Sequence, residues 1–134
     1  MSQATGGIRI LHYLNPFFAG VGGEEFNDRG PQVEKDSRGP GRLLDKLLGD
    51  TGKVVATLIC GDNYFSDHQN EVHAALAQAV KTHRAELIIA GPAFNAGRYG
   101  LACGSLCQFA ADRLGLAAVT AMSLENPGTE FRRR

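Results

Sequence analysis

Apolar residues fall into short runs that alternate with longer amphipathic segments. Four aliphatic runs have the length of buried strands, at residues 8–14, 54–59, 86–90 and 116–121. Three segments between them repeat apolar positions at helical spacing, at residues 40–48, 66–84 and 99–114. This alternation predicts an α/β fold of the Rossmann-like or flavodoxin-like kind. We expect a single three-layer domain over residues 1–134, with a mainly parallel four-stranded sheet and helices on both faces.

Residues 15–39 interrupt this alternation, because they show no clear period and are rich in glycine. A connection of about 25 residues is much longer than the usual 2–6 between a strand and a helix, and such loops are often functional. Its first half contains Phe17 and Phe18, two adjacent side chains that require burial. The second half is charged around residues 34–38 and is expected to be solvated.

Glycine and polar residues follow each of the four predicted strands, at residues 15–25, 60–63, 91–99 and 125–128. The connections at the opposite edge are short and carry little chemistry. Ligands of open parallel sheets bind beyond the carboxyl ends of the strands, so this asymmetry predicts a binding cleft at that edge. Residues 91–100 are its most specialised part, with three glycines and a proline shaping the backbone.

Within that loop, Asn95, Arg98 and Tyr99 are candidates for substrate binding. A guanidinium group such as that of Arg98 matches a carboxylate in shape and charge. The alternative for Arg98 is an ion pair with a surface carboxylate.

The other loops add candidates of the same kind. Asp62 and Asn63 could hydrogen-bond a ligand amine or hydroxyl, or could cap the following helix. Asn15 and Asn126 are substrate-binding candidates from the first and last loops. Glu24 could bind an ammonium group or face solvent.

Cys60 follows a buried strand and is a candidate catalytic nucleophile, or else a small buried apolar residue. The chain has three cysteines and no Cys-x-x-Cys pair, so neither a disulfide framework nor a metal site is expected. His12 lies inside the first strand and is interpreted as a core residue. The glycines at 20–23 lack the context of a dinucleotide fingerprint, and a Walker loop is absent.

The amino-acid composition limits the kinds of partner that the chain is expected to bind. Fourteen basic and fourteen acidic residues cancel, which gives no support for binding nucleic acid or an anionic membrane. No apolar run approaches the roughly 20 residues of a membrane span. Residues 1–7 lack the features of a signal peptide, so we expect the chain in the cytoplasm.

Six motifs together resemble a known family in content and order: residues 12–25, 39–41, 59–65, 91–100, 102–104 and 125–128. The resemblance is to the amino-terminal domain of the selenoprotein B component of glycine, sarcosine, betaine and D-proline reductases. It covers about residues 8–131.

The resemblance implies reductive cleavage of a C–N bond in a small amine or amino acid derivative. In that family a selenocysteine attacks the carbon next to nitrogen, and a pyruvoyl group on a partner subunit holds the amine where that mechanism applies. The selenocysteine lies downstream of the region matched here. The resemblance therefore implies no cofactor in this chain, a selenocysteine or cysteine pair and a pyruvoyl group elsewhere, and a hetero-oligomer of reductase subunits. The alternative is a non-catalytic module that binds a small molecule or another subunit.

Overall fold

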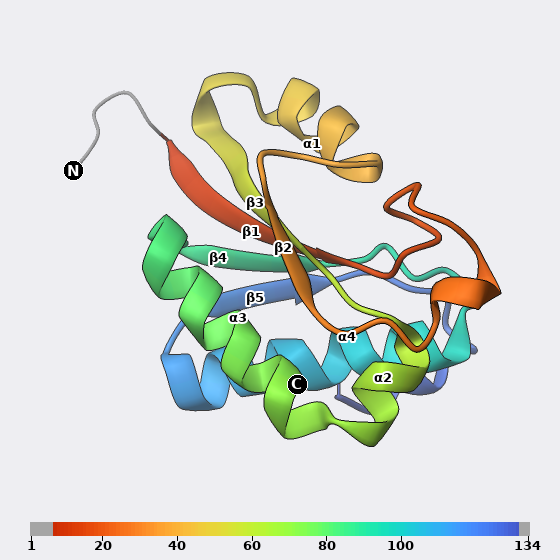
Figure 1. The fold of residues 1–134 in the computed structure, drawn as a ribbon. Helices are drawn as coiled ribbons and strands as arrows, with labels where there is room; N and C mark the ends of the chain where they lie inside the picture. The colour runs from red at the N-terminus through yellow and green to blue at the C-terminus, as the bar shows by residue number, and fades with distance from the viewer. Residues whose placement is uncertain (1–6, 132–134) are drawn as a thin grey trace.

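The computed structural model describes residues 7–131, which form a sheet flanked by helices (Figure 1). Residues 1–6, which carry most of the segment used above to judge a signal peptide, lie outside this range. The strands are β1 (Ile8–Leu14), β2 (Gln32–Lys35), β3 (Gly52–Ile59), β4 (Leu87–Ala90) and β5 (Ala117–Thr120). The α-helices are α1 (Pro40–Leu48), α2 (Asp62–Asp67), α3 (Gln69–His83) and α4 (Gly97–Phe109). Short helical turns are η1 (Glu24–Phe26), η2 (Gly49–Thr51), the π-helical η3 (Ala110–Leu114) and η4 (Pro127–Phe131).

The five strands are ordered β2-β3-β1-β4-β5, with β1, β3, β4 and β5 parallel and β2 antiparallel to β3. The α/β class is confirmed, but the prediction of four strands is wrong, because the sheet formed by residues 7–131 has five, and β2 makes it mixed. The missed strand, Gln-Val-Glu-Lys, is short and mostly exposed. Its sequence has no apolar run because it lies at the edge of the sheet, where pairing with β3 forms it.

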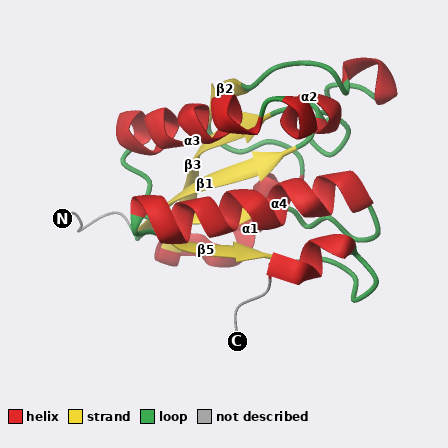
Figure 2. Ribbon diagram, turned by 90° about the horizontal axis from the view of Figure 1, so that it is seen from below, coloured by secondary structure: helices red, strands yellow, loops and turns green. Residues whose placement is uncertain are grey.

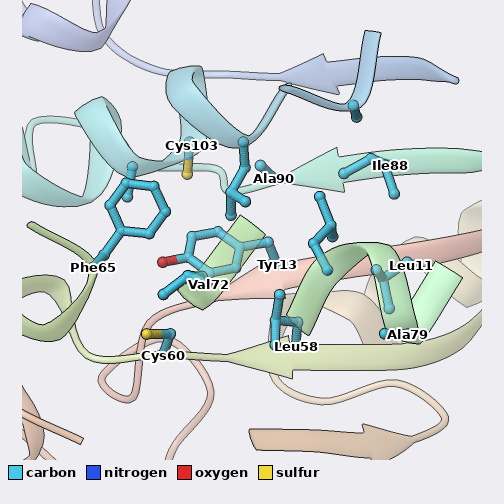
Figure 3. Close-up of a cluster of buried hydrophobic side chains, with 14 of the residues drawn as sticks. Leu11, Tyr13, Leu58, Cys60, Phe65, Val72, Ala79, Ile88, Ala90 and Cys103 are labelled. Atoms are coloured by element: carbon cyan, nitrogen blue, oxygen red, sulfur yellow. The ribbon is translucent and has the colours of Figure 1, made fainter. Parts of the chain in front are cut away.

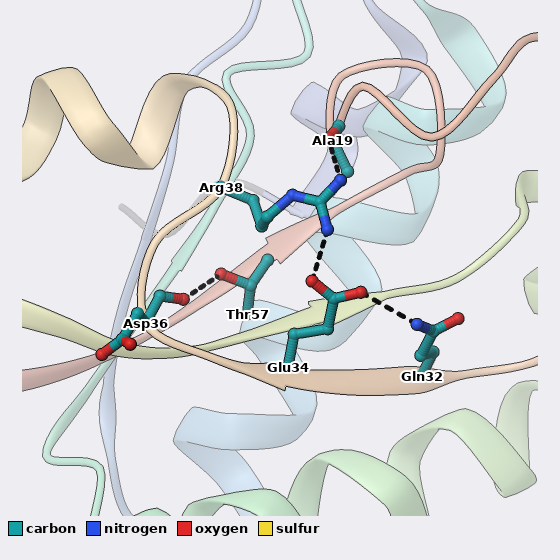
Figure 4. Close-up of polar contacts among 6 residues, drawn as sticks. All are labelled: Ala19, Gln32, Glu34, Asp36, Arg38 and Thr57. Carbon is teal, nitrogen blue, oxygen red and sulfur yellow. Dashed lines mark hydrogen bonds and ion pairs between the residues drawn. The ribbon is translucent and has the colours of Figure 1, made fainter.

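Side chains tie this edge strand to its surroundings (Figure 4). Arg38 forms an ion pair with Glu34 and donates a 3.1 Å hydrogen bond from Nη2 to the carbonyl of Ala19. Thr57 of β3 donates from Oγ1 to the Asp36 carbonyl at 2.8 Å. The segment 15–39 is therefore a structured connection that crosses the carboxyl edge of the sheet and returns along β3.

The two faces of the sheet are covered unequally (Figures 1 and 2). Helices α2, α3 and α4 lie on one face, where the main core contains Leu11, Tyr13, Leu58 and Ile88 (Figure 3). Among the described α-helices, α1 alone lies on the other face. The carboxyl ends of β1, β3 and β4 meet where the loops predicted to form a site begin.

Two helix boundaries differ from the sequence prediction. The predicted segment 66–84 is divided between two helices, because Ser66 belongs to α2 and α3 begins at Gln69. The residue before α3, His68, makes no side-chain capping bond. The third predicted helix begins at Gly97 and continues through η3. Gly115 ends it with φ 67°, in the left-handed region that glycine commonly adopts at helix ends.

Candidate functional site at the carboxyl edge of the sheet

Asn15 joins the ends of two neighbouring strands. It directly follows β1, and its side-chain Nδ2 donates a 3.1 Å hydrogen bond to Oδ2 of Asp62, just beyond β3. Its Oδ1 accepts from the backbone N–H of Phe18 at 2.9 Å. Asn15 is therefore buried and holds both the first loop and the Asp62 carboxyl group in place.

Asp62 carries a buried oxygen that the fold leaves unsatisfied. The residue is 9% exposed, and no residue in the range 7–131 forms a hydrogen bond to its Oδ1. Burial raises the pKa of this carboxyl group, while the Asn15 hydrogen bond and the charge of Arg98 oppose that rise. The capping alternative is not supported, because Gly61 is the N-cap of α2 and no side chain caps it. An unpaired buried carboxyl oxygen is costly, and a ligand that donates a hydrogen bond would relieve that cost.

Arg98 brings a positive charge to the same place from the loop after β4. Its Nη1 donates to Oδ1 of Asn63, and its charge acts on Asp62. The guanidinium group is exposed, and its ion-pairing alternative is not observed within residues 7–131. The site thus sets a buried carboxyl group beside an accessible guanidinium, an arrangement that suits a small molecule with an ammonium and a carboxylate.

Two predicted site residues are built into the fold. Tyr99 is fully buried, donates from its hydroxyl to the Tyr13 carbonyl at 2.8 Å, and stacks on Phe18 with ring centres 5.4 Å apart. Asn126 is 2% exposed and uses both ends of its amide within the protein. Neither side chain has a polar group directed to Asp62, so we assign them to the support of the loops.

Asn126 fastens the loop that follows β4. Its Nδ2 donates to the carbonyls of Phe94 at 2.9 Å and Ala96 at 3.1 Å, and its Oδ1 accepts from the N–H of Gly128 at 2.9 Å. Gly100 is required beneath it, because a Cβ there would lie 1.9 Å from Asn126 Oδ1. This contact explains two of the motif residues by packing.

Glu24 and Asn95 both lie at the surface. Glu24 begins η1, and Asn95 follows the exposed Phe94 in the loop after β4. No side-chain hydrogen bond within residues 7–131 brings either of them to Asp62. They remain predictions as ligand contacts.

Cys60 lies behind the site and not in it. Its side chain is fully buried, with Sγ 3.8 Å from the carbonyl of Arg29, and burial raises the pKa of the thiol to about 12. A thiol with this pKa stays protonated at neutral pH and is a poor nucleophile. Burial also raises the pKa of Cys103. Of the two interpretations of Cys60, the geometry favours the buried apolar residue.

Tyr13 is a residue that the sequence did not single out. Its hydroxyl is buried without a hydrogen-bond partner in the described chain, and burial raises its pKa well above the usual value, with smaller contributions from Cys60, Cys103 and Asp62. Figure 3 shows the ring among the apolar side chains of the core. Strand periodicity predicts Tyr13 only as a core residue. The sequence therefore gives no signal that its hydroxyl is buried without a hydrogen-bond partner.

A hollow of about 580 Å³ lies elsewhere, between α3 and α4. Ser105 Oγ donates to Oε1 of Gln69 at 3.1 Å, and Nε2 of His73 lies 3.2 Å from the same Oγ. The His73 ring stacks on Phe109. These polar groups form hydrogen bonds with one another, whereas Oδ1 of Asp62 has no hydrogen-bond partner within residues 7–131. In residues 7–131 no group of three or more His, Cys, Asp or Glu side chains is placed to hold a metal ion.

Comparison with known proteins agrees with the motifs at this edge. Residues 7–134 match the family described as glycine/sarcosine/betaine reductase selenoprotein B (GRDB). The chain belongs to this family. No solved structure matches it. Within the described residues, no helix combines the length and apolar character needed to cross a membrane.

Curated relatives of the GRDB family are components of three kinds of reductase. The chain is 48% identical over 127 residues to the glycine reductase complex component B subunit gamma of Symbiobacterium thermophilum, covering 95% of this chain and 30% of the relative. It is 43% identical over 127 residues to the sarcosine reductase complex component B subunit beta of Peptoclostridium acidaminophilum, covering 95% and 29%. The betaine reductase complex component B subunit beta of the same organism is 35% identical over 123 residues, covering 92% and 28%. The chain thus spans less than a third of the length of these relatives.

Proposed function

We propose that this chain is a subunit or domain of a glycine, sarcosine or betaine reductase, in which it binds a small amino acid derivative. The observation that carries the proposal is the unpaired, buried Oδ1 of Asp62 beside the guanidinium of Arg98. The names of the relatives support the substrate class, because glycine, sarcosine and betaine each combine an amine-derived nitrogen with a carboxylate.

The two charged groups have separate roles in this proposal. Oδ1 of Asp62 accepts a hydrogen bond from the ammonium N–H of glycine or sarcosine, and the carboxylate balances the charge of the quaternary nitrogen of betaine, which has no N–H. Arg98, held by Asn63, pairs with the substrate carboxylate through its remaining N–H groups. Asn15 keeps Asp62 in position from the end of β1. Opposite charges at opposite ends fix the orientation of the bound molecule.

The bond-breaking group is proposed to lie on another segment or subunit. The thiols of Cys60, Cys103 and Cys107 are disfavoured as nucleophiles, because burial raises the pKa of all three. A selenocysteine or cysteine pair, and a pyruvoyl group, would come from that partner. Reductive C–N cleavage therefore requires a hetero-oligomer in this proposal, with this chain supplying the position of the substrate. That this chain is located in the cytoplasm is also a prediction.

Arg98→Ala tests the assignment of the carboxylate partner. We expect binding of glycine or sarcosine to weaken by about 1.5–3 kcal/mol, the range for a hydrogen bond to a charged group. Isothermal titration calorimetry at low salt measures the change. The matched control is Arg113→Ala, which removes an exposed arginine from η3 at the opposite edge of the sheet. Equal affinity of Arg98→Ala and the unmodified chain would remove Arg98 from the site.

A further inference from the structure

Half of one sheet face carries apolar side chains without a cover. Parallel sheets are normally buried on both faces by helices. Here α1 covers β1 and β3, where Gly41 packs against His12 and the Asp45 carboxylate accepts from the N–H of Val54 at 2.8 Å. On the same face, beside α1, side chains of β4 and β5 line a hollow that the described helices leave open.

The uncovered region forms an apolar groove. It has a volume of about 290 Å³ and is lined by α1, β4, β5 and the residues after β4. Leu47 is 76% exposed, Leu43 59% and Val119 53%, values far above those of ordinary core positions. Ile89 of β4 and Pro92 after it also line the groove. We call this surface the α1–β5 groove.

Strand β5 is also poorly covered by the rest of the described chain. All four of its residues, Ala-Ala-Val-Thr, are at least partly exposed, although three are apolar. Within the described chain it pairs only with β4. A parallel strand of this composition is expected inside a layered domain, so further polypeptide belongs on this side of the sheet.

We propose that the α1–β5 groove binds an amphipathic helix from the part of the component B polypeptide that lies outside the region shared with this chain. The relatives are more than three times as long as the aligned region, so about 70% of their length is available to supply it. A helix suits the groove because it would lie beside α1 and complete the second helical layer of the sheet.

Positive charges beside the α1–β5 groove indicate which residues the bound helix should carry. Arg42 and Lys46 are exposed on α1 beside the two leucines, and neither forms an ion pair within residues 7–131. The helix is therefore expected to place aliphatic residues against Leu43, Leu47 and Val119, and acidic residues at its border with α1. This proposal is independent of the ligand bound at Asp62.

Site-specific photo-crosslinking in the cells that naturally make the protein tests the proposal. The full chain carries p-benzoylphenylalanine in place of Leu47, and mass spectrometry identifies the crosslinked peptide. We expect a helical segment of a polypeptide homologous to the unshared part of component B, whether joined to this chain or separate. The matched control places the same group at Val33, an exposed aliphatic residue on β2 at the other end of the sheet.

A second substitution makes the result decisive. Val119→Glu places a charge in the groove and is expected to reduce the Leu47 crosslink at least about tenfold, since 1.4 kcal/mol corresponds to that factor. A melting curve verifies that the variant folds, and Leu43→Glu replaces it otherwise. The proposal is overturned if the crosslink is absent, reaches a second copy of this chain or an unrelated protein, appears equally from Val33, or persists in the folded Glu variant.

Discussion

Asp62→Asn is expected to bind a small ammonium carboxylate about 2–4 kcal/mol more weakly than the unmodified chain, the cost of removing one partner of a buried charge pair. Asparagine keeps the shape of the side chain, and its Oδ1 can still accept the hydrogen bond from Asn15. The loss would therefore come from the missing charge. Calorimetry with glycine, sarcosine and betaine measures it.

The same substitution is expected to increase stability at neutral pH. Burial raises the pKa of Asp62 in the folded state above its unfolded value of 3.8. The folded state then binds more protons than the unfolded state between these two pKa values, so the free energy of unfolding falls as the pH rises through that window. Asparagine has no proton to lose. Urea denaturation should show Asp62→Asn more stable at pH 7, with the difference shrinking as the pH falls towards 4.

Opposite effects on binding and stability separate a ligand-binding carboxyl group from a structural one. Asp67→Asn, at the exposed end of α2, is the matched control and should change neither quantity. If Asp62→Asn instead destabilised the fold and left affinity unchanged, Asp62 would be a structural residue and the proposed site would lose its main component.

Asn126→Ala is expected to have the largest effect on stability, a loss of about 3 kcal/mol. It removes three hydrogen bonds, each worth about 1 kcal/mol net, and leaves the buried N–H of Gly128 without its partner. It also opens a space above Gly100, where the amide packs closely. Urea denaturation at pH 7 measures the change in the free energy of unfolding.

The control for this prediction is the neighbouring amide. Asn95→Ala removes an exposed side chain from the same loop, so its effect should stay within about 0.5 kcal/mol. Equal stability of the two variants would show that Asn126 does not fasten the loop after β4.

The sequence predicted the parts of the fold that depend on local pattern. The sequence predicted β1, β3, β4 and β5 from their aliphatic runs and α3 from its helical repeat. Buried strands and helices need apolar residues in such runs or at such regular spacing. Strand β2 has no such apolar pattern, since its four residues are mostly exposed and are held by pairing with β3 and by Arg38. Edge strands of this kind are formed by tertiary contacts.

The sequence could predict which loops meet at the carboxyl edge of the sheet, but not which of their polar side chains are used within the fold. The rule that loops meet at the carboxyl edge brought Asn15, Asp62 and Arg98 to one point. It could not show that Tyr99 turns into the core and Asn126 turns under the loop, because both directions depend on neighbours distant in sequence. Polar residues that build a loop and polar residues that bind a ligand look alike in a sequence.

The most direct test of the proposed function is a titration of the 15N-labelled chain with glycine, sarcosine and betaine, followed by NMR. The account predicts that the largest shifts of at least one titration occur at Asn15, Asp62, Asn63 and Arg98, and that Asp62→Asn abolishes them. Shifts centred between α3 and α4, or no saturable shift with any of the three compounds, would contradict a substrate site at the carboxyl edge of the sheet.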